Sequence, residues 1–202
     1  MDVVRKCIAN PEASIEECLG PTPRDLDEIW AWNHDLPPTY DACMHDIVDE
    51  RAQSCPEKVA ISSWDGDLTY GQISRYSTAL AWSLKDSGIQ LHDFLPVCFE
   101  KSRWTVVALL AVMKAGATVV LMDPTLPVAR LQNMAAQVGA KAMVSSSSQH
   151  ALSKSIIPEG KHFVVEEGTF AEQTDQNPQL PPVPPSAVRI HLNVTRLYSH
   201  KN

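Results

Sequence analysis

The sequence lacks the short glycine-rich motifs that would assign a nucleotide-binding or hydrolytic function directly. Its 202 residues include eight glycines, yet they form neither a Gly-x-Gly-x-x-Gly fingerprint nor a Gly-x-x-x-x-Gly-Lys loop. A Gly-x-Ser-x-Gly nucleophile elbow is absent as well. The chain therefore contains none of the motifs that usually mark a phosphate site or an activated serine.

A basic surface and a membrane-spanning stretch are also missing. There are 17 lysines and arginines against 24 aspartates and glutamates, which gives a net charge of −7 and argues against nucleic acid as a partner. The longest apolar run, residues 106–113, is far shorter than the roughly 20 residues that a spanning helix needs. No apolar segment typical of a secretory signal follows the N-terminus. We expect a cytoplasmic protein with neither a nucleic-acid nor a membrane partner.

The cysteines do not form a recognisable metal or disulfide pattern. Their number is odd, they are widely spaced, and no Cys-x-x-Cys pair occurs, so both kinds of site are poorly supported. Reduced thiols in a cytosolic protein explain them better. The five are Cys7, Cys18, Cys43, Cys55 and Cys98.

What the chain does contain is a strand–helix–strand unit, around which the other elements are arranged. Residues 95–99 form a short apolar run typical of a strand, and Ser102 is a suitable N-cap for a helix over residues 103–115. Gly116 stands where a helix end favours a left-handed residue. Residues 118–122 have the β-branched, apolar composition of a strand buried on both faces. The unit predicts parallel pairing with a right-handed crossover.

The same alternation continues along the chain and predicts the fold class. Further strands are expected over residues 58–63, 68–70, 141–145 and 162–165. Further helices are expected from residue 22 to 33 and over residues 41–55, 70–87, 128–138 and 149–155. We predict an α/β fold, with a layered and mostly parallel sheet flanked by helices.

Three segments resemble a known family. Residues 113–124, Met-Lys-Ala-Gly-Ala-Thr-Val-Val-Leu-Met-Asp-Pro, are similar to the second core motif of nonribosomal peptide synthetase adenylation domains, Leu-Lys-Ala-Gly-Gly-Ala-Tyr-Val-Pro-Leu-Asp-Pro. Residues 68–73, Leu-Thr-Tyr-Gly-Gln-Ile, resemble the first, Leu-Thr-Tyr-x-Glu-Leu. Residues 96–102 with Trp104 resemble a segment of the fungal branch. The likeness runs from about residue 25 to 185.

The resemblance implies a domain organisation and an activity. Residues 1–24 would be the remnant of a linker, residues 25–168 a partial AMP-binding adenylation domain that forms the N-terminal half of its core, and residues 169–202 a proline-rich loop and a disordered tail. The complete family domain uses ATP and magnesium to convert an amino acid into aminoacyl-AMP for the biosynthesis of peptide secondary metabolites.

The catalytic part of the family pattern is not found. The family places a Thr-Ser-Gly-Ser-Thr-Gly-x-Pro-Lys phosphate loop soon after a proline-rich segment like residues 178–185, but this sequence has no glycine after Gly168. It also ends before the amino-acid pocket, the ribose-binding Asp and the C-terminal catalytic Lys of the family. Ala117, Val119 and Leu121 replace the Gly, aromatic residue and Pro of the second motif. We expect a truncated ligase fragment that is inactive alone and binds no cofactor.

Several polar residues suggest a metal, acid–base or phosphate site, but structural roles explain them better. The acidic and histidine pairs on the 41–55 helix suggest a metal or acid–base site, but a solvated helix face explains them better. The serine run suggests a phosphate cradle, yet without glycines it fits a polar turn or cap. We therefore assign no catalytic, cofactor-binding or metal-binding residue. The residues considered are His45, Asp46, Asp49, Glu50, Glu100, Lys114, Asp123, Arg130 and the run Ser145 to Ser148.

An alternative hypothesis is that the chain is a stand-alone, non-catalytic interaction module built on the same half-domain. In both cases the apolar faces of the 95–99 and 118–122 strands and of the 103–115 helix would lack the cover that the rest of the domain supplies. We expect self-association or a protein partner through these faces.

The C-terminal tail departs from the family pattern Val-Tyr-Ile-x-Phe-Thr-Ser-Gly-Ser-Thr-Gly. Codons for Arg189, Ile190 and His191 can be chosen so that reading one base later gives Val-Tyr-Ile. We hypothesise that a frameshift or retained intron near Val188 replaced the phosphate loop, and we expect the resulting tail to be disordered.

Overall fold

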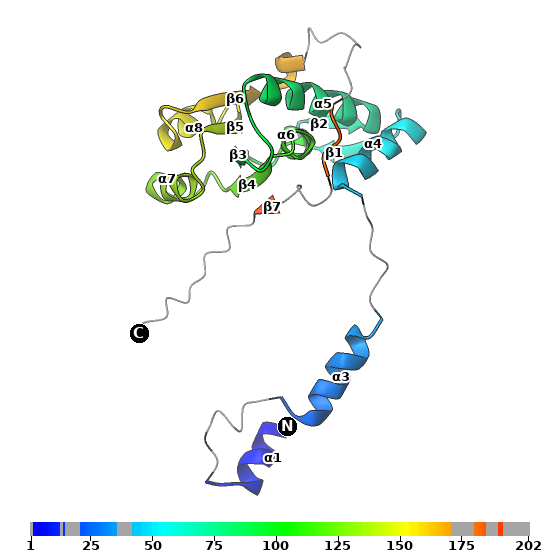
Figure 1. The fold of residues 1–202 in the computed structure, drawn as a ribbon, viewed down its shortest axis with the longest axis vertical. Helices are drawn as coiled ribbons and strands as arrows, with labels where there is room; N and C mark the ends of the chain where they lie inside the picture. Colours follow the sequence, from blue (N-terminus) through cyan, green and yellow to red (C-terminus); the bar gives the residue numbers. More distant parts are fainter. Residues whose placement is uncertain are drawn as a thin grey trace. The chain divides into compact units, whose positions relative to one another are not determined.

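The computed structural model describes residues 2–12, 14, 21–35, 42–170, 180–184 and 190–191. The chain divides into two compact units, Met1–Tyr40 and Asp41–Asn202, which are described separately (Figure 1). None of the described helices is long and apolar enough to cross a membrane.

The first unit contains the helices α1 (Asp2–Ala9) and α3 (Pro23–Asn33). Thr22 caps α3: its hydroxyl accepts a hydrogen bond from the Asp25 amide at 3.1 Å, and the Asp25 carboxylate accepts one from the Thr22 amide at 2.8 Å. Within this unit Trp30 and Trp32 are 70% and 76% exposed. This cap needs only hydrogen bonds between neighbouring residues, so it does not depend on packing against another element.

The second unit is built on a five-stranded sheet with the order β6-β5-β3-β4-β7. All four pairings between neighbours are parallel, as the α/β prediction requires. The predicted strand–helix–strand unit is confirmed, since β3 and β4 are adjacent and α6 connects them. The strands are β3 (Phe94–Cys98), β4 (Thr118–Met122), β5 (Ala142–Ser146), β6 (Lys161–Val165) and β7 (Ile190–His191).

Alternate residues of the strands enter two different hydrophobic clusters, as expected for a sheet with both faces covered. Leu95, Val97 and Val119 pack in the cluster formed with α5 (Tyr70–Asp86) and α6 (Arg103–Lys114). Cys98, Val120 and Met122 face the other cluster, with α7 (Val128–Gln137) and α8 (His150–Ile156). The sheet is thus the middle layer of three (Figure 1).

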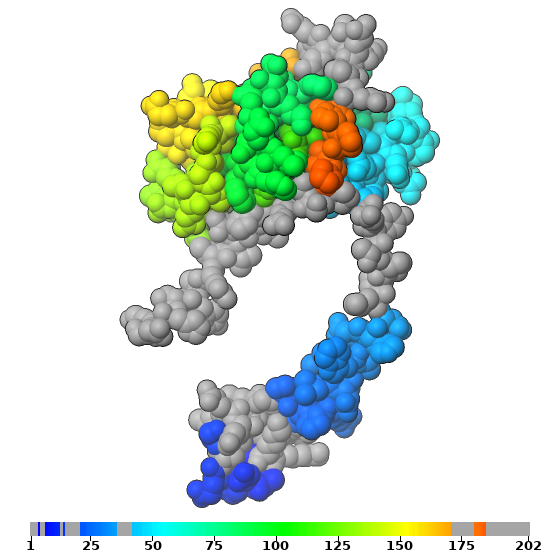
Figure 2. Space-filling view, in the orientation of Figure 1, coloured from blue at the N-terminus to red at the C-terminus, as the bar shows by residue number. Residues whose placement is uncertain are grey.

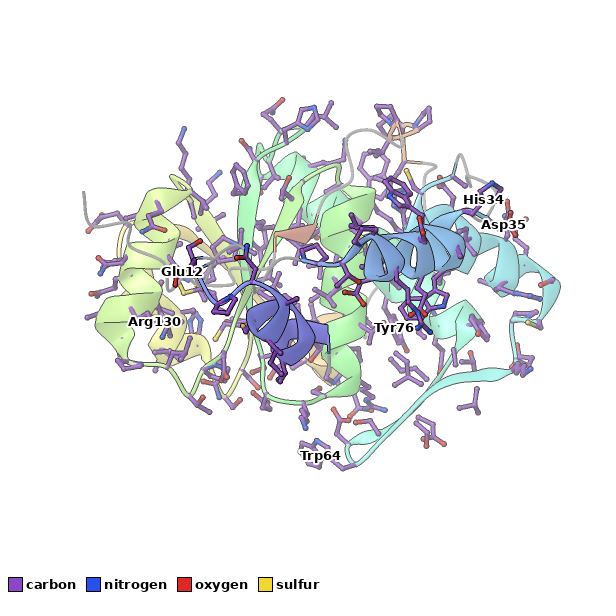
Figure 3. All side chains as sticks on the ribbon, turned by 90° about the horizontal axis from the view of Figure 1, so that it is seen from below. Glu12, His34, Asp35, Trp64, Tyr76 and Arg130 are labelled. Atoms are coloured by element: carbon purple, nitrogen blue, oxygen red, sulfur yellow. The ribbon has the colours of Figure 1, made fainter. Side chains whose placement is uncertain are left out.

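An antiparallel hairpin of β1 (Val59–Ser63) and β2 (Gly66–Thr69) adjoins this body, as its Asp-Gly turn predicts. The turn also caps α6, because the Asp65 carboxylate accepts hydrogen bonds from the Ser102 hydroxyl at 2.6 Å and from the Arg103 amide at 3.1 Å. Trp64 is exposed at the tip of the hairpin (Figure 3). The hairpin therefore fixes the start of the central helix.

The helix α4 (Met44–Ser54) buries a residue that was expected on its solvated face. Met44 is 56% exposed, whereas His45, expected on a solvated face, is buried. The solvated-face interpretation is therefore wrong for His45. Asp49, on the same side of the helix, hydrogen-bonds inward to Lys114 and Ser74, so polar contacts add to the burial of Val48 and Ala52 on the inward face of α4.

The apolar strand faces that were expected to be uncovered are buried. Leu95 and Val119 are almost wholly inaccessible, and so is Val107 on α6, while Val106 and Phe94 remain exposed. Helices on both sides of the sheet cover these strands. The serine run is likewise partly internal, because Ser145 and Ser146 belong to β5 and are buried.

The C-terminal region contains one element that the sequence analysis did not predict. Ile190 and His191 form β7 and pair in parallel with Val119 and Val120 of β4. Disorder was expected there, but the exposed edge of β4 offers unpaired backbone groups that an extended segment can satisfy. The rest of the expected disordered tail, residues 192–202, lies outside the described residues.

Gly116 provides a test of the turn between α6 and β4. Its φ is +79°, and a Cβ built there would lie 2.5 Å from Leu91 Cδ1, so Gly116→Ala combines a left-handed alanine with a forced change of the exposed Leu91 side chain. We expect it to lower the free energy of unfolding by about 2 kcal/mol, measured by urea denaturation. Gly88 is the matched control: its φ is +96° with no atom within 4 Å of the added Cβ, so Gly88→Ala should cost only about 1 kcal/mol. Equal costs would contradict a contact at Gly116.

Candidate functional site

Lys114, the last residue of α6, is a charged residue in the interior. It is only 3% exposed. Its Nζ lies 2.7 Å from Asp49 Oδ1, 2.9 Å from Thr78 Oγ1 and 3.3 Å from the Ser74 carbonyl oxygen. Three hydrogen bonds match the three donors of an ammonium group. The buried charge is thus both neutralised and fully hydrogen-bonded, which agrees with the interpretation of Lys114 as a structural residue.

Three helices, α4, α5 and α6, contribute side chains to the network around Lys114. Ser74 and Thr78 stand four residues apart on α5 and therefore on one face, where the Ser74 hydroxyl also donates to Asp49 Oδ1 at 2.6 Å. Asp49 comes from α4. Burial lowers the pKa of Lys114 below its usual value, and the hydrogen bond and charge of Asp49 oppose that shift. Sequence spacing does not reveal this network because its members are 25 and 65 residues apart.

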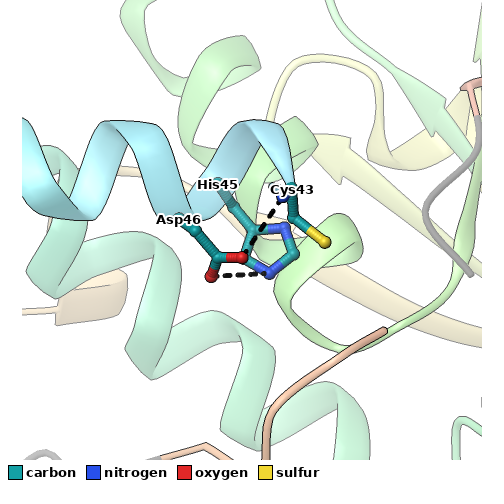
Figure 4. A group of neighbouring side chains, drawn as sticks. All are labelled: Cys43, His45 and Asp46. Atoms are coloured by element: carbon teal, nitrogen blue, oxygen red, sulfur yellow. Dashed lines mark hydrogen bonds and ion pairs between the residues drawn. The ribbon is translucent and has the colours of Figure 1, made fainter. Parts of the chain in front are cut away.

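A second polar group lies at the N-terminus of α4 (Figure 4). Cys43 is the N-cap residue, and its amide donates to Asp46 Oδ2 at 3.3 Å. The His45 Nε2 atom lies 3.5 Å from Asp46 Oδ1. Burial lowers the pKa of His45, while the charge of Asp46 opposes that shift, so burial favours the neutral imidazole.

Both groups border one cavity of about 660 Å³. Its walls come from α4, α5, the end of α6 and the segment of residues 180–183. Figure 2 shows that segment, in orange, between the helices coloured green and the cyan α4. The thiol of Cys43 donates a hydrogen bond to the Val183 carbonyl oxygen at 3.4 Å, which ties the proline-rich segment to the start of α4.

The carboxyl ends of the strands form the edge where ligands bind in open parallel sheets. Glu100 follows β3 and accepts hydrogen bonds from the hydroxyls of Ser146 and Ser148, each at 2.8 Å. Burial acts to raise the pKa of Glu100, but hydrogen bonds from its own backbone amide and from these serines outweigh it and hold the pKa below the usual value. Asp123 follows β4 and accepts from the amide and hydroxyl of Thr125 at 2.9 and 2.7 Å.

The Asp123 contacts form a local turn, Glu100 connects the end of β3 to the end of β5, and Arg130 lies on α7 (Figure 3). Two carboxylates at this edge repel phosphate rather than attract it. Three described glycines with positive φ, Gly88, Gly116 and Gly139, precede strands and so stand at the opposite, amino-terminal edge. None of the described glycines with positive φ stands at the carboxyl edge of this sheet.

Cys98, at the end of β3, gives a test of burial at this edge. Burial, together with the charges of Asp123 and Glu100, raises the pKa of its thiol to about 11. At pH 8 only about one thiol in a thousand is then the reactive thiolate. We expect iodoacetamide to modify the exposed Cys7 and to leave Cys98 unmodified in the folded protein, as read by peptide mass spectrometry.

In urea, where burial is lost, both cysteines should react at similar rates. Modification of Cys98 at the rate of Cys7 under native conditions would contradict the buried position.

The family of the chain follows from comparison with known proteins. A family model described as AMP-binding enzyme matches residues 48–192, which include the hairpin and all five strands of the parallel sheet. The chain belongs to the AMP-binding enzyme family. The resemblance found in its core motifs is thereby confirmed.

Its relatives among known proteins are fungal nonribosomal peptide synthetases. The chain is 63% identical over 190 residues to the nonribosomal peptide synthetase sidD of Aspergillus fumigatus, covering 93% of this chain and 9% of that protein. It is 47% identical over 166 residues to the corresponding protein of Beauveria bassiana, covering 82% of this chain and 9% of that protein. The chain thus spans about a tenth of the length of the relatives it matches.

Solved structures confirm the fold of this AMP-binding protein. The nonribosomal peptide synthetase FmoA3 in its AMPPNP-bound form superposes with a TM-score of 0.70 at 19% identity, over 90% of this chain and 20% of that one. VinN superposes with a TM-score of 0.66 at 16% identity, over 75% of this chain and 40% of that one. The similarity shows that the arrangement of strands and helices is that of an adenylation domain.

Proposed function

We propose that this chain forms the N-terminal part of an amino-acid-activating adenylation domain of a cytoplasmic nonribosomal peptide synthetase, and that it forms no aminoacyl-AMP by itself. The observation that carries the proposal is its 63% identity, over nearly its whole length, to one tenth of such a synthetase. The sequence lacks the family's glycine-rich phosphate loop, which supports the second half of the proposal.

The chemistry explains why this part alone is insufficient. In adenylation, a substrate carboxylate attacks the α-phosphate of ATP and pyrophosphate leaves, so a site must supply donors and cations where negative charge increases. At the carboxyl edge of this sheet the described residues instead present Glu100 and Asp123, both hydrogen-bonded within the chain. In a complete domain, ATP and magnesium would be held by residues of the phosphate loop and of the parts that follow it.

What this chain contributes is a rigid platform. The sheet is buried on both faces, and β7 is paired with β4, so a segment that follows His191 leaves the sheet at the same edge as Asp123. A phosphate loop placed after such a strand would lie at the ligand-binding edge. The platform thus fixes the position of catalytic groups that it does not itself carry.

A chimera tests the proposal. Residues 42–184 of this chain would replace the matching segment of the Aspergillus fumigatus relative, and amino-acid-dependent exchange of pyrophosphate into ATP would be compared with that of the parent. We expect the chimera to retain exchange with the same amino acid, because cores tolerate extensive substitution when volume and pattern are kept. A folded chimera without exchange would overturn the platform role.

A further inference from the structure

The cluster at the start of α4 has the composition of a metal site. Cys43, His45 and Asp46 each offer one ligand atom, and these atoms all lie within 4.8 Å of one another. In Figure 4 the imidazole stands between the thiol and the carboxylate. Among the described residues it is the one group of three or more such side chains with this spacing.

A second observation points to a ligand at the same place. The His45 side chain is 6% exposed, and its Nδ1 atom has no hydrogen-bond partner among the described residues. An unpaired buried polar atom costs about 1–3 kcal/mol unless water or an ion satisfies it. The Lys114 network nearby does not satisfy it, since that network uses only Asp49, Ser74 and Thr78.

We propose that Cys43, His45 and Asp46 bind one divalent cation of the zinc class. A thiolate, a neutral imidazole and a carboxylate are the ligands that Zn²⁺ takes in proteins, at about 2.0–2.3 Å. Two anionic ligands balance the dication, so the bound site is electrically neutral. His45 and Asp46 border the cavity of about 660 Å³, from which a water molecule can complete four-coordination.

The local structure favours this assignment. Cys43 is the N-cap residue of α4, and the positive end of a helix dipole stabilises a thiolate. Binding releases the thiol proton to solvent, and the hydrogen bond from Cys43 to the Val183 carbonyl is exchanged for the metal bond. The ammonium of Lys114 is neutralised by Asp49, which limits its repulsion of the cation.

The ligand atoms need only a small adjustment. Tetrahedral bonds of about 2.0–2.3 Å place neighbouring ligand atoms roughly 3.3–3.8 Å apart. In the structure the three ligand atoms lie within 4.8 Å of one another. A small change in the side-chain torsion angles is enough to bring them to the tetrahedral spacing.

Cobalt(II), a spectroscopic substitute for zinc, tests the site in the full 202-residue chain after chelator treatment. We expect a thiolate-to-cobalt charge-transfer band that saturates at one equivalent and is displaced by Zn²⁺. Cys43→Ser should abolish this band and weaken cobalt binding at least tenfold, and His45→Gln and Asp46→Asn should each weaken it at least tenfold. Serine is itself a good N-cap, so Cys43→Ser is expected to fold, which far-UV circular dichroism checks.

Cys55→Ser is the matched control, because it removes a thiol at the other end of the same helix and should leave the band unchanged. Zn²⁺ should also raise the melting temperature of the wild-type chain and of Cys55→Ser, but not that of Cys43→Ser. Absence of the band, its persistence in Cys43→Ser, or its loss in Cys55→Ser would overturn the proposal. The assay contains no ATP, so its outcome is independent of the chimera experiment.

Discussion

Incubated with ATP, magnesium and each amino acid in turn, the purified 202-residue chain is expected to show no amino-acid-dependent exchange of pyrophosphate into ATP. Removal of a single hydrogen-bond donor to a developing oxyanion typically lowers kcat by about 10²–10³. This chain lacks the whole loop that supplies such donors in the family, and its described residues at the ligand-binding edge include the carboxylates of Glu100 and Asp123. The combined loss places any exchange below detection.

The Aspergillus fumigatus relative, assayed in parallel with the same amino acids, is the positive control. Exchange by the isolated chain that follows the protein through purification and depends on one amino acid would show that the chain is catalytic alone. That result would remove the second half of the proposed function and leave the family assignment intact.

The other large effect is expected at the buried ion pair. Asp49→Ala leaves the Lys114 ammonium buried without its counter-charge, and we expect the free energy of unfolding to fall by about 2–3 kcal/mol at pH 7. This figure lies at the lower end of the range for broken buried pairs because the Asp49 side chain is 33% exposed. Urea denaturation followed by circular dichroism measures it.

Lys114→Met should cost less than about 1 kcal/mol, although it removes the same ion pair. Methionine fills the volume of the lysine stem, and the remaining Asp49 carboxylate keeps the Ser74 hydroxyl and contact with water. The double variant Asp49→Ala with Lys114→Met should resemble Lys114→Met alone, because no buried charge is left.

Glu167→Ala is the control. It breaks an ion pair with Arg103 in which Glu167 is 86% exposed, and it should change the free energy of unfolding by less than about 0.5 kcal/mol.

The pH dependence gives an independent check of the same variant. The folded-state pKa of Lys114 is already below its usual value because of burial, and Asp49→Ala removes the group that opposes this shift. Between the folded-state pKa and the usual value of about 10.4, the unfolded chain binds more protons, so stability rises with pH in that window. The cost of Asp49→Ala should therefore shrink as the pH is raised from 7 to 10. A constant or growing cost would show that Lys114 is not the uncompensated charge.

Much of the fold could be predicted from local signals. Ser102 caps α6 as expected, Gly116 adopts the left-handed conformation expected at the end of α6, and the alternation of strands and helices gives the parallel sheet. These features depend on a few neighbouring residues, which is why the sequence is sufficient for them. The same signals failed for the burial of His45 on α4, because the weakly apolar surface of this helix leaves the inward face undecided until α5 and α6 are in place.

The sequence by itself therefore determined the α/β class, the boundaries of most elements and the family. Only the tertiary structure decided that His45 is buried beside Cys43 and Asp46, and that Lys114 is neutralised by Asp49. The physical reason is that burial and pairing of a polar side chain depend on groups from other helices, up to 65 residues away in the chain, whereas caps and periodicity are properties of adjacent residues.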